Sequence, residues 1–140
     1  GRKANAGFYN YDEKGKRTGL WAGLTDRYAA VDEQPDLTEV QHRLLFAQVL
    51  EAVRALKEGV LMDIREGDVG AILGWGFAPW SGGPFSWLDI LGAPYAAERC
   101  DQLQEKFGDR FECPALLREM AESGQSFYGR FGTGADSKAA

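Results

Sequence analysis

Leu73 to Gly92 read LGWGFAPWSGGPFSWLDILG, and the rest of the chain is best interpreted around this stretch. It contains three of the four tryptophans, five glycines and two prolines. Aromatic side chains bury a large area per residue, and glycine permits positive φ and a close backbone approach. Pro84 suits the first turn of a helix, and Gly92 suits its end. We therefore predict a helix end, a compact corner plugged by aromatic side chains, and a short helix over 84–91.

The glycines of this corner do not match a phosphate-binding motif. Gly74 and Gly76 have no third glycine at dinucleotide-binding spacing, and they follow no strand pattern. No Gly-Lys-Ser/Thr motif is present either. A structural corner is therefore favoured over a ligand-binding loop.

A long amphipathic helix is predicted before the corner. Asp36 and Glu39 have the spacing of a capping box. Apolar residues then recur at intervals of three and four until Gly59 ends the pattern. These apolar residues are Val40, Leu44, Leu45, Val49, Ala52, Val53 and Leu56.

Four shorter helices complete the predicted fold. Asp63 has the capping pattern of a helix start, and Pro84, Pro94 and Pro114 each suit a first helical turn. No window shows sustained period-two alternation, so the fold class is all-α, a small domain of about five helices. The four shorter helices are expected near 64–73, 84–91, 94–107 and 114–122.

The corner also carries a family resemblance. Gly74-x-Gly-Phe-x-Pro-x-x-Gly-Gly-Pro, followed by Asp89 and Gly92, resembles the signature corner of the C-terminal helical domain of 3-hydroxyacyl-CoA dehydrogenases. It is most similar to the second copy of that domain in multifunctional β-oxidation proteins of the bacterial fatty-oxidation complex alpha subunit type. The resemblance implies a fold like the C-terminal domain of 6-phosphogluconate dehydrogenase.

The resemblance also implies a domain organisation. Gly-Arg-Lys-x-x-x-Gly-Phe-Tyr-x-Tyr at the start resembles the segment that closes the first helical copy in this family. Because the chain opens without Met, we expect a fragment of a longer protein. The expected parts are 1–17 as the closing segment of a preceding copy, 18–35 as a linker with a short helical turn near 25–31, 36–130 as the second helical copy, and 131–140 as a disordered tail.

The corner residues are expected to be structural or to form an interface. Asp89 is expected to tie the corner to backbone donors, because a buried carboxylate needs such partners, and catalysis is the less favoured alternative. Trp75, Phe77, Trp80 and the helix over 40–56 are candidates for core or interface. The full set is Gly74, Trp75, Gly76, Phe77, Pro79, Trp80, Gly82, Gly83, Pro84, Asp89 and Gly92.

His42 is the single histidine and the one weak candidate for catalysis. The family oxidises L-3-hydroxyacyl-CoA to 3-ketoacyl-CoA with NAD, using a histidine base in a preceding Rossmann domain. Its first copy has an Asn-Arg pair where this chain has His42 and Arg43. A surface or boundary histidine, able to pair with Glu39, is therefore favoured. We expect no catalytic residue and no cofactor in this chain, with NAD bound elsewhere in the parent enzyme.

The composition limits the classes of further partners that are expected. A net charge of −5 argues against nucleic acid and anionic membranes, and no apolar run approaches a membrane span. The basic run 14–17 is expected to be a solvated turn, with a site for a CoA phosphate as the alternative. Cys100 and Cys113 lack metal-site spacing, so two reduced thiols in a cytoplasmic protein are favoured over a disulfide.

Two functional hypotheses remain. The favoured one is a non-catalytic domain that packs on the preceding dehydrogenase domains as a pseudo-dimer partner, in a parent enzyme that acts on acyl-CoA. A thiolase subunit, an enoyl-CoA hydratase activity and self-association of the fragment are further candidates. The alternative is a stand-alone helical module that binds acyl-CoA or a partner protein, because the aromatic residues over 75–87 could form an exposed apolar patch.

Overall fold

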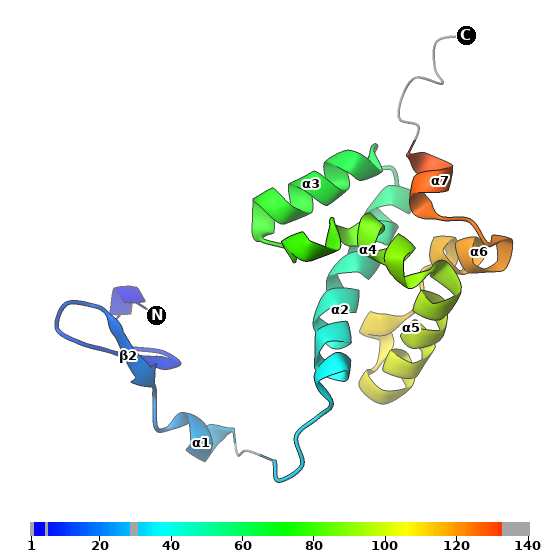
Figure 1. Cartoon of the computed structure of the whole chain (residues 1–140). Helices are drawn as coiled ribbons and strands as arrows, with labels where there is room; N and C mark the ends of the chain where they lie inside the picture. The colour runs from blue at the N-terminus through cyan, green and yellow to red at the C-terminus, as the bar shows by residue number, and fades with distance from the viewer. Residues whose placement is uncertain (1, 5, 29–30, 133–140) are drawn as a thin grey trace. The chain divides into compact units, whose positions relative to one another are not determined.

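The computed structural model describes residues 2–4, 6–28 and 31–132 (Figure 1). The chain divides into two compact units, Gly1–Asp36 and Leu37–Ala140. Each unit is considered by itself below. The second unit contains the corner.

The first unit contains a short β-hairpin. Strands β1 (Tyr9–Tyr11) and β2 (Arg17–Leu20) pair antiparallel, flanked by the 3₁₀ turn η1 (Arg2–Ala4) and helix α1 (Leu24–Arg27). The Asp12 carboxylate closes the turn by accepting hydrogen bonds of 2.9 Å from two backbone N–H groups, those of Lys14 and Lys16. The basic run is thus a hairpin turn.

This hairpin was not predicted from the sequence. Strands of three and four residues are too short to show period-two alternation in the sequence. β2 also crosses the expected boundary between residues 17 and 18. The two expected segments therefore share one hairpin.

The second unit is helical, which confirms the prediction of a small, mostly α-helical domain. The five predicted helices correspond to α2 through α6. Helix α3 ends two residues beyond its predicted end, and the ends of α4, α5 and α6 lie within one residue of the predicted ones. The elements are α2 (Leu37–Lys57), α3 (Ile64–Trp75), η2 (Pro79–Ser81), α4 (Pro84–Leu91), α5 (Ala93–Phe107), η3 (Asp109–Phe111), α6 (Ala115–Ser123) and α7 (Phe127–Phe131).

The short helix α7 was not predicted. Ser126 caps it by accepting a 3.0 Å hydrogen bond from the Gly129 backbone N–H. Phe127 is buried, and Phe131 packs against the core, so a disordered tail beginning at residue 131 is wrong for that residue. The rest of the predicted tail from 133 onward lies outside the described residues.

Helix α4 lies at the centre of the second unit and packs against α2, α3, α5 and α7 (Figure 1). Phe85 and Leu88 of α4 are fully buried, as are Phe46 and Leu50 of α2. Phe46 meets Trp87 edge-on, with ring centroids 5.4 Å apart. Aromatic pairs at this spacing stabilise a core beyond the area they bury. The corner that precedes α4 is therefore attached directly to the core.

Asp63 caps α3, as predicted from its spacing. Its carboxylate accepts hydrogen bonds from the Arg65 guanidinium and, at 2.8 Å, from the Arg65 backbone N–H. These bonds hold the pKa of Asp63 at about 2, below its ordinary value of 3.8. The carboxylate therefore favours the folded state in its ionised form.

We expect Asp63→Asn to remove a pH dependence of stability at acid pH. Because the folded-state pKa of Asp63 is lowered, its stabilisation is present above the ordinary value and is lost as pH falls through about 2. Asparagine is also a good N-cap, so the variant removes mainly the charge. Urea unfolding at several pH values should show the stability of wild type falling toward that of the variant between about pH 4 and about pH 2. An unchanged difference across this range would contradict the assignment.

Candidate functional site

The backbone of the corner uses glycine where positive φ is required. Gly76 caps the end of α3 in the left-handed conformation (φ 77°, ψ 35°), and Gly83 precedes α4 with φ 116°. A Cβ atom on Gly83 would lie 2.4 Å from Cβ and 2.6 Å from Cα of Asp68. Gly83 is thus needed both for its conformation and for the close approach of α3.

Asp68 holds the start of α4. Its side chain accepts hydrogen bonds from the backbone N–H of Phe85 (2.7 Å) and of Ser86 (3.0 Å), and from the Ser86 hydroxyl (2.6 Å). The Tyr128 hydroxyl donates a further bond of 2.9 Å to the same carboxylate. The first N–H groups of a helix have no partner within it, and a carboxylate there also meets the positive end of the helix dipole.

Sequence reasoning did not predict this role of Asp68. The sequence feature that could have indicated this role is an indirect one. Gly83 stands at the N-cap of α4 and has no side chain, so an acceptor had to come from elsewhere in the fold. Burial raises the pKa of Tyr128, and its hydrogen bond to the carboxylate raises it further. Tyr128 therefore acts as a donor that links α7 to α3.

Asp89 binds backbone donors, but these are not in the corner. Its two carboxylate oxygens accept from the N–H groups of Phe127 (2.6 Å) and Tyr128 (2.9 Å), at the start of α7. Two carboxylates thus accept hydrogen bonds from backbone N–H groups at the starts of two different helices. Asp68 holds α4, and Asp89 holds α7.

The prediction that aromatic side chains plug the corner is right for Phe77 and wrong for two tryptophans. Phe77 is buried, as is Trp87 of α4. Trp75 is 61% exposed and Trp80 is 72% exposed. Because α3 ends at Trp75 and the chain reverses at Gly76, it is Phe77 that enters the core. The Trp75 indole N–H instead donates to Gln48 Oε1 of α2 at 3.0 Å.

His42 is buried, which corrects the expectation of a surface or boundary position. It is 8% exposed, and its Nδ1 accepts a 3.0 Å hydrogen bond from Nε of Arg99 on α5. Its ring contacts the rings of Phe46, Trp87 and Tyr95, with centroids 5.6 to 6.3 Å apart. These contacts join α2, α4 and α5, and they favour a packing role over proton transfer.

Other parts of the surface are hollowed. A cavity of about 470 Å³ lies beside Lys14, Lys16 and Arg17 of the hairpin turn. In the second unit, a cavity of about 230 Å³ has two cationic residues, Arg54 and Lys57, and two acidic residues, Glu58 and Glu112, in its lining. Both are open to solvent. The charged residues that line the hairpin cavity are all cationic, so it could accept a small anion, whereas the second cavity is lined by charges of both signs.

The described residues also limit the kinds of site. Within 2–4, 6–28 and 31–132, there is no group of three or more His, Cys, Asp or Glu that could hold a metal ion. In the same ranges no helix has both the length and the apolar character needed to cross a bilayer.

Comparison with known proteins identifies relatives of this chain. No family model matches it. It is 41% identical over 131 residues to fatty acid oxidation complex subunit alpha from Shewanella loihica, 40% over 135 residues to that from Shewanella amazonensis, and 39% over 132 residues to that from Shewanella halifaxensis. Each match covers 91% of this chain but spans 18% of the relative. The chain is thus related to one segment of the bacterial fatty acid oxidation complex alpha subunits.

Proposed function

We propose that this chain is the second C-terminal helical domain of an NAD-dependent 3-hydroxyacyl-CoA dehydrogenase of fatty-acid β-oxidation, where it packs on the preceding helical domain and does not itself catalyse the reaction. The observation that carries the proposal is identity of about 40% over 91% of the chain to a segment of fatty acid oxidation complex alpha subunits. The intact enzyme would oxidise L-3-hydroxyacyl-CoA to 3-ketoacyl-CoA, with NAD bound by another domain.

The packing role is supported by the two exposed tryptophans. An indole in water leaves a large apolar area uncovered, and tryptophan is enriched among the residues that dominate protein interfaces. The η2 turn that carries Trp80 is held by the Ser81 hydroxyl, which donates to the Ala78 carbonyl oxygen at 2.6 Å and accepts from the Gly83 backbone N–H at 3.1 Å. A surface that is already ordered costs little entropy on binding. We take Trp75 and Trp80 as the centre of the surface that faces the preceding domain.

The absence of catalysis in this domain is supported by the surroundings of His42. A general base needs a free nitrogen within hydrogen-bond reach of the substrate hydroxyl. Nδ1 of His42 is engaged by Arg99, and three aromatic rings contact the imidazole. His42 therefore resembles a packed core residue more than a base that faces substrate.

A complementation experiment tests the proposal. The alpha subunit of Shewanella loihica would be truncated to remove the segment that matches this chain, and the chain would be supplied as a separate polypeptide. We expect the two to associate, and NADH-dependent reduction of acetoacetyl-CoA to rise on association. The chain alone should show no turnover. Turnover by the chain alone would contradict the non-catalytic role, and a lack of association would contradict the packing role.

We expect Trp80→Ala to weaken this association by at least about 2 kcal/mol, or roughly 30-fold in Kd. The reason is that truncation removes the indole from a buried position in the complex. Met62→Ala is the matched control, because Met62 is 78% exposed and belongs to the connection between α2 and α3, outside the 73–92 stretch. Titration calorimetry gives both affinities, and thermal melts check that both variants remain folded. Equal affinity of the two variants would place the interface elsewhere.

The exposure of the same tryptophans also favours a second candidate, a module that binds acyl-CoA. Trp75 and Trp80 are exposed whereas Trp87 is buried, so ligand at the corner would shift the emission of the exposed pair to shorter wavelength. Titration of the chain with acetoacetyl-CoA and with a long-chain acyl-CoA separates the candidates. A shift that Trp80→Ala abolishes would support acyl-CoA binding, and unchanged emission supports packing.

A further inference from the structure

A groove lined by apolar and cationic residues lies where α2, the end of α5 and η3 meet. Its volume is about 470 Å³, which is within the range of sites that hold small molecules. None of its lining residues belongs to the 73–92 stretch. The groove is therefore distinct from the corner and from the surface around Trp75 and Trp80.

Apolar side chains supply most of the lining. Val40, Leu44 and Ala47 recur at intervals of four and three, so they share one face of α2. Leu44 is 64% exposed, and covering it would remove apolar area from water. Phe107 and Phe111 complete the apolar lining, with ring centroids 6.3 Å apart, and Phe111 is buried. The groove thus offers an ordered surface to an apolar group.

Two guanidinium groups supply the charge of the groove. Among the described residues that line it, only Arg43 and Arg110 are charged. Neither forms an ion pair with a carboxylate of the described part of the chain. Four other arginines of the second unit do: Arg54, Arg65, Arg118 and Arg130. The chain has 21 acidic residues against 16 basic ones, so a shortage of carboxylates does not explain two unpaired arginines in one groove.

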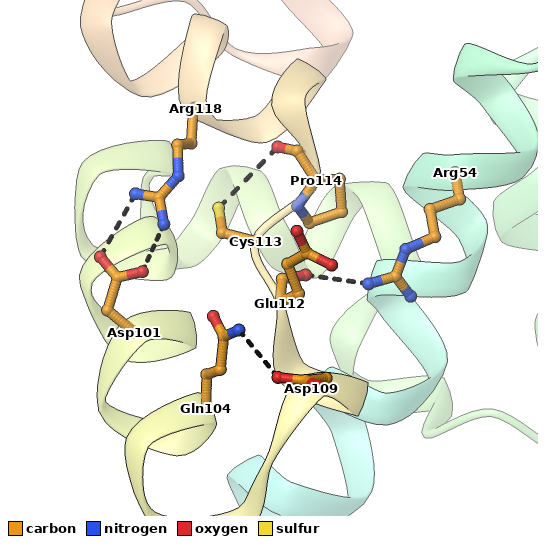
Figure 2. Close-up of polar contacts among 8 residues, drawn as sticks. All are labelled: Arg54, Asp101, Gln104, Asp109, Glu112, Cys113, Pro114 and Arg118. Carbon is orange, nitrogen blue, oxygen red and sulfur yellow. Dashed lines mark hydrogen bonds and ion pairs between the residues drawn. The ribbon is translucent and has the colours of Figure 1, made fainter.

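The carboxylate nearest in sequence to each of these arginines is bound to another side chain. Glu39, four residues before the first arginine, accepts a 2.9 Å hydrogen bond from Lys106 Nζ. Asp109, which directly precedes the second arginine, accepts a 3.3 Å bond from the Gln104 amide (Figure 2). The two guanidinium groups therefore keep their donors for an acceptor from outside the chain.

Arg43 is also positioned by an aromatic ring. Its Cζ atom lies 4.0 Å from the centroid of the Phe107 ring. A guanidinium over a ring face is attracted by the ring, and this contact does not consume the N–H donors in the guanidinium plane. Those donors match the oxygens of a carboxylate or a phosphate. Arg43 is therefore held in the lining in a form that can bind an oxyanion.

We propose that this groove binds a small amphipathic anion. Its carboxylate or phosphate head lies at Arg43 and Arg110, and its apolar body covers Leu44, Phe107 and Phe111. The two kinds of lining residue match the two halves of such a ligand, and the volume fits a small molecule. The site does not depend on the role proposed for the corner, because the two share no residue.

Nuclear magnetic resonance titration of the ¹⁵N-labelled chain tests the proposal. The probes are octanoate, octyl phosphate and 1-octanol, which share one apolar body and differ in the head. We expect both anions to shift backbone amides within 40–47 and 107–111, and the alcohol to bind at least about tenfold more weakly, because it lacks the charge-assisted hydrogen bonds. The anion that binds more tightly identifies the head group. No binding by either anion, or equal affinity for the alcohol, would overturn the proposal.

Arginine variants test the head of the ligand. Arg43→Gln and Arg110→Gln should each weaken binding of the preferred anion by about tenfold. Arg118→Gln removes the same charge from an arginine that pairs with Asp101 outside the groove, and it should leave the affinity unchanged (Figure 2). Thermal melts check that all three variants remain folded. Equal affinities in the three variants would show that net charge, and not this groove, attracts the anion.

Two further variants test the apolar body and the place of the site. Leu44→Ala should weaken binding by about threefold or more, because it removes apolar area that the ligand covers. Trp80→Ala removes an exposed aromatic side chain from the corner and should leave the affinity unchanged. Loss of binding in Trp80→Ala together with unchanged binding in Leu44→Ala would move the ligand to the corner and refute the groove as its site.

Discussion

Asp68→Ala is expected to destabilise the helical unit by about 3–5 kcal/mol, the cost of breaking a buried network around a charge. The substitution leaves the Phe85 and Ser86 backbone N–H groups and the Tyr128 hydroxyl without the acceptor that now serves them. It also detaches α3 from the starts of α4 and α7. A small domain has about 5–15 kcal/mol of stability in total, so such a loss takes a large part of it.

Urea unfolding, followed by circular dichroism, measures this effect of Asp68. Asp68→Asn should lose less, because its amide oxygen can still accept one of the backbone bonds while its NH₂ group faces donors. Glu122→Ala removes an exposed carboxylate on α6 and should change stability by no more than about 0.5 kcal/mol. If Asp68→Ala fell within the same range as Glu122→Ala, the carboxylate would not hold the corner.

Gly83→Ala is expected to cost about 3 kcal/mol or more, for two separate reasons. Its φ of 116° is strained for any residue with a Cβ atom, at about 1–3 kcal/mol. The new methyl group would also lie within 2.6 Å of the Asp68 backbone, which cannot swing aside as a flexible side chain can. Overpacking of this kind adds about 1–3 kcal/mol.

Gly74→Ala is the matched control, with the opposite sign expected. Gly74 lies in α3, is exposed, and would have no atom within 4 Å of a new Cβ. Replacing a helical glycine with alanine stabilises by about 0.5–1 kcal/mol. In the same urea series, the unfolding midpoint should therefore fall for Gly83→Ala and rise for Gly74→Ala. Destabilisation of similar size in both variants would mean that loss of glycine, rather than contact with Asp68, governs the effect.

The helices could be predicted because their signals are local. Pro84 and Gly92 bound α4 at the residues expected, since proline and glycine act on the backbone conformation of their own positions. The capping spacing of Asp63 predicted the start of α3, and three- and four-residue apolar intervals predicted α2. The hairpin and α7 were not predicted, because segments of three to five residues are too short to show a hydrophobic period.

The candidate site was less predictable, because its side chains are sorted by contacts between distant segments. Trp75 and Phe77 look alike in the sequence, and only the direction in which the chain leaves α3 buries one and exposes the other. His42 was expected near the surface, yet α4 and α5 cover it. Its burial depends on helices that lie more than forty residues further along the chain.

Local sequence pattern was thus sufficient for the helical class, the helix limits and the glycine-rich corner, since each depends on the conformational preferences of neighbouring residues. The tertiary structure alone decided that Asp68, not Asp89, holds the start of α4. The physical reason is that a hydrogen bond requires its two partners to lie close together in space, and segments distant in sequence come that close only when the helices pack.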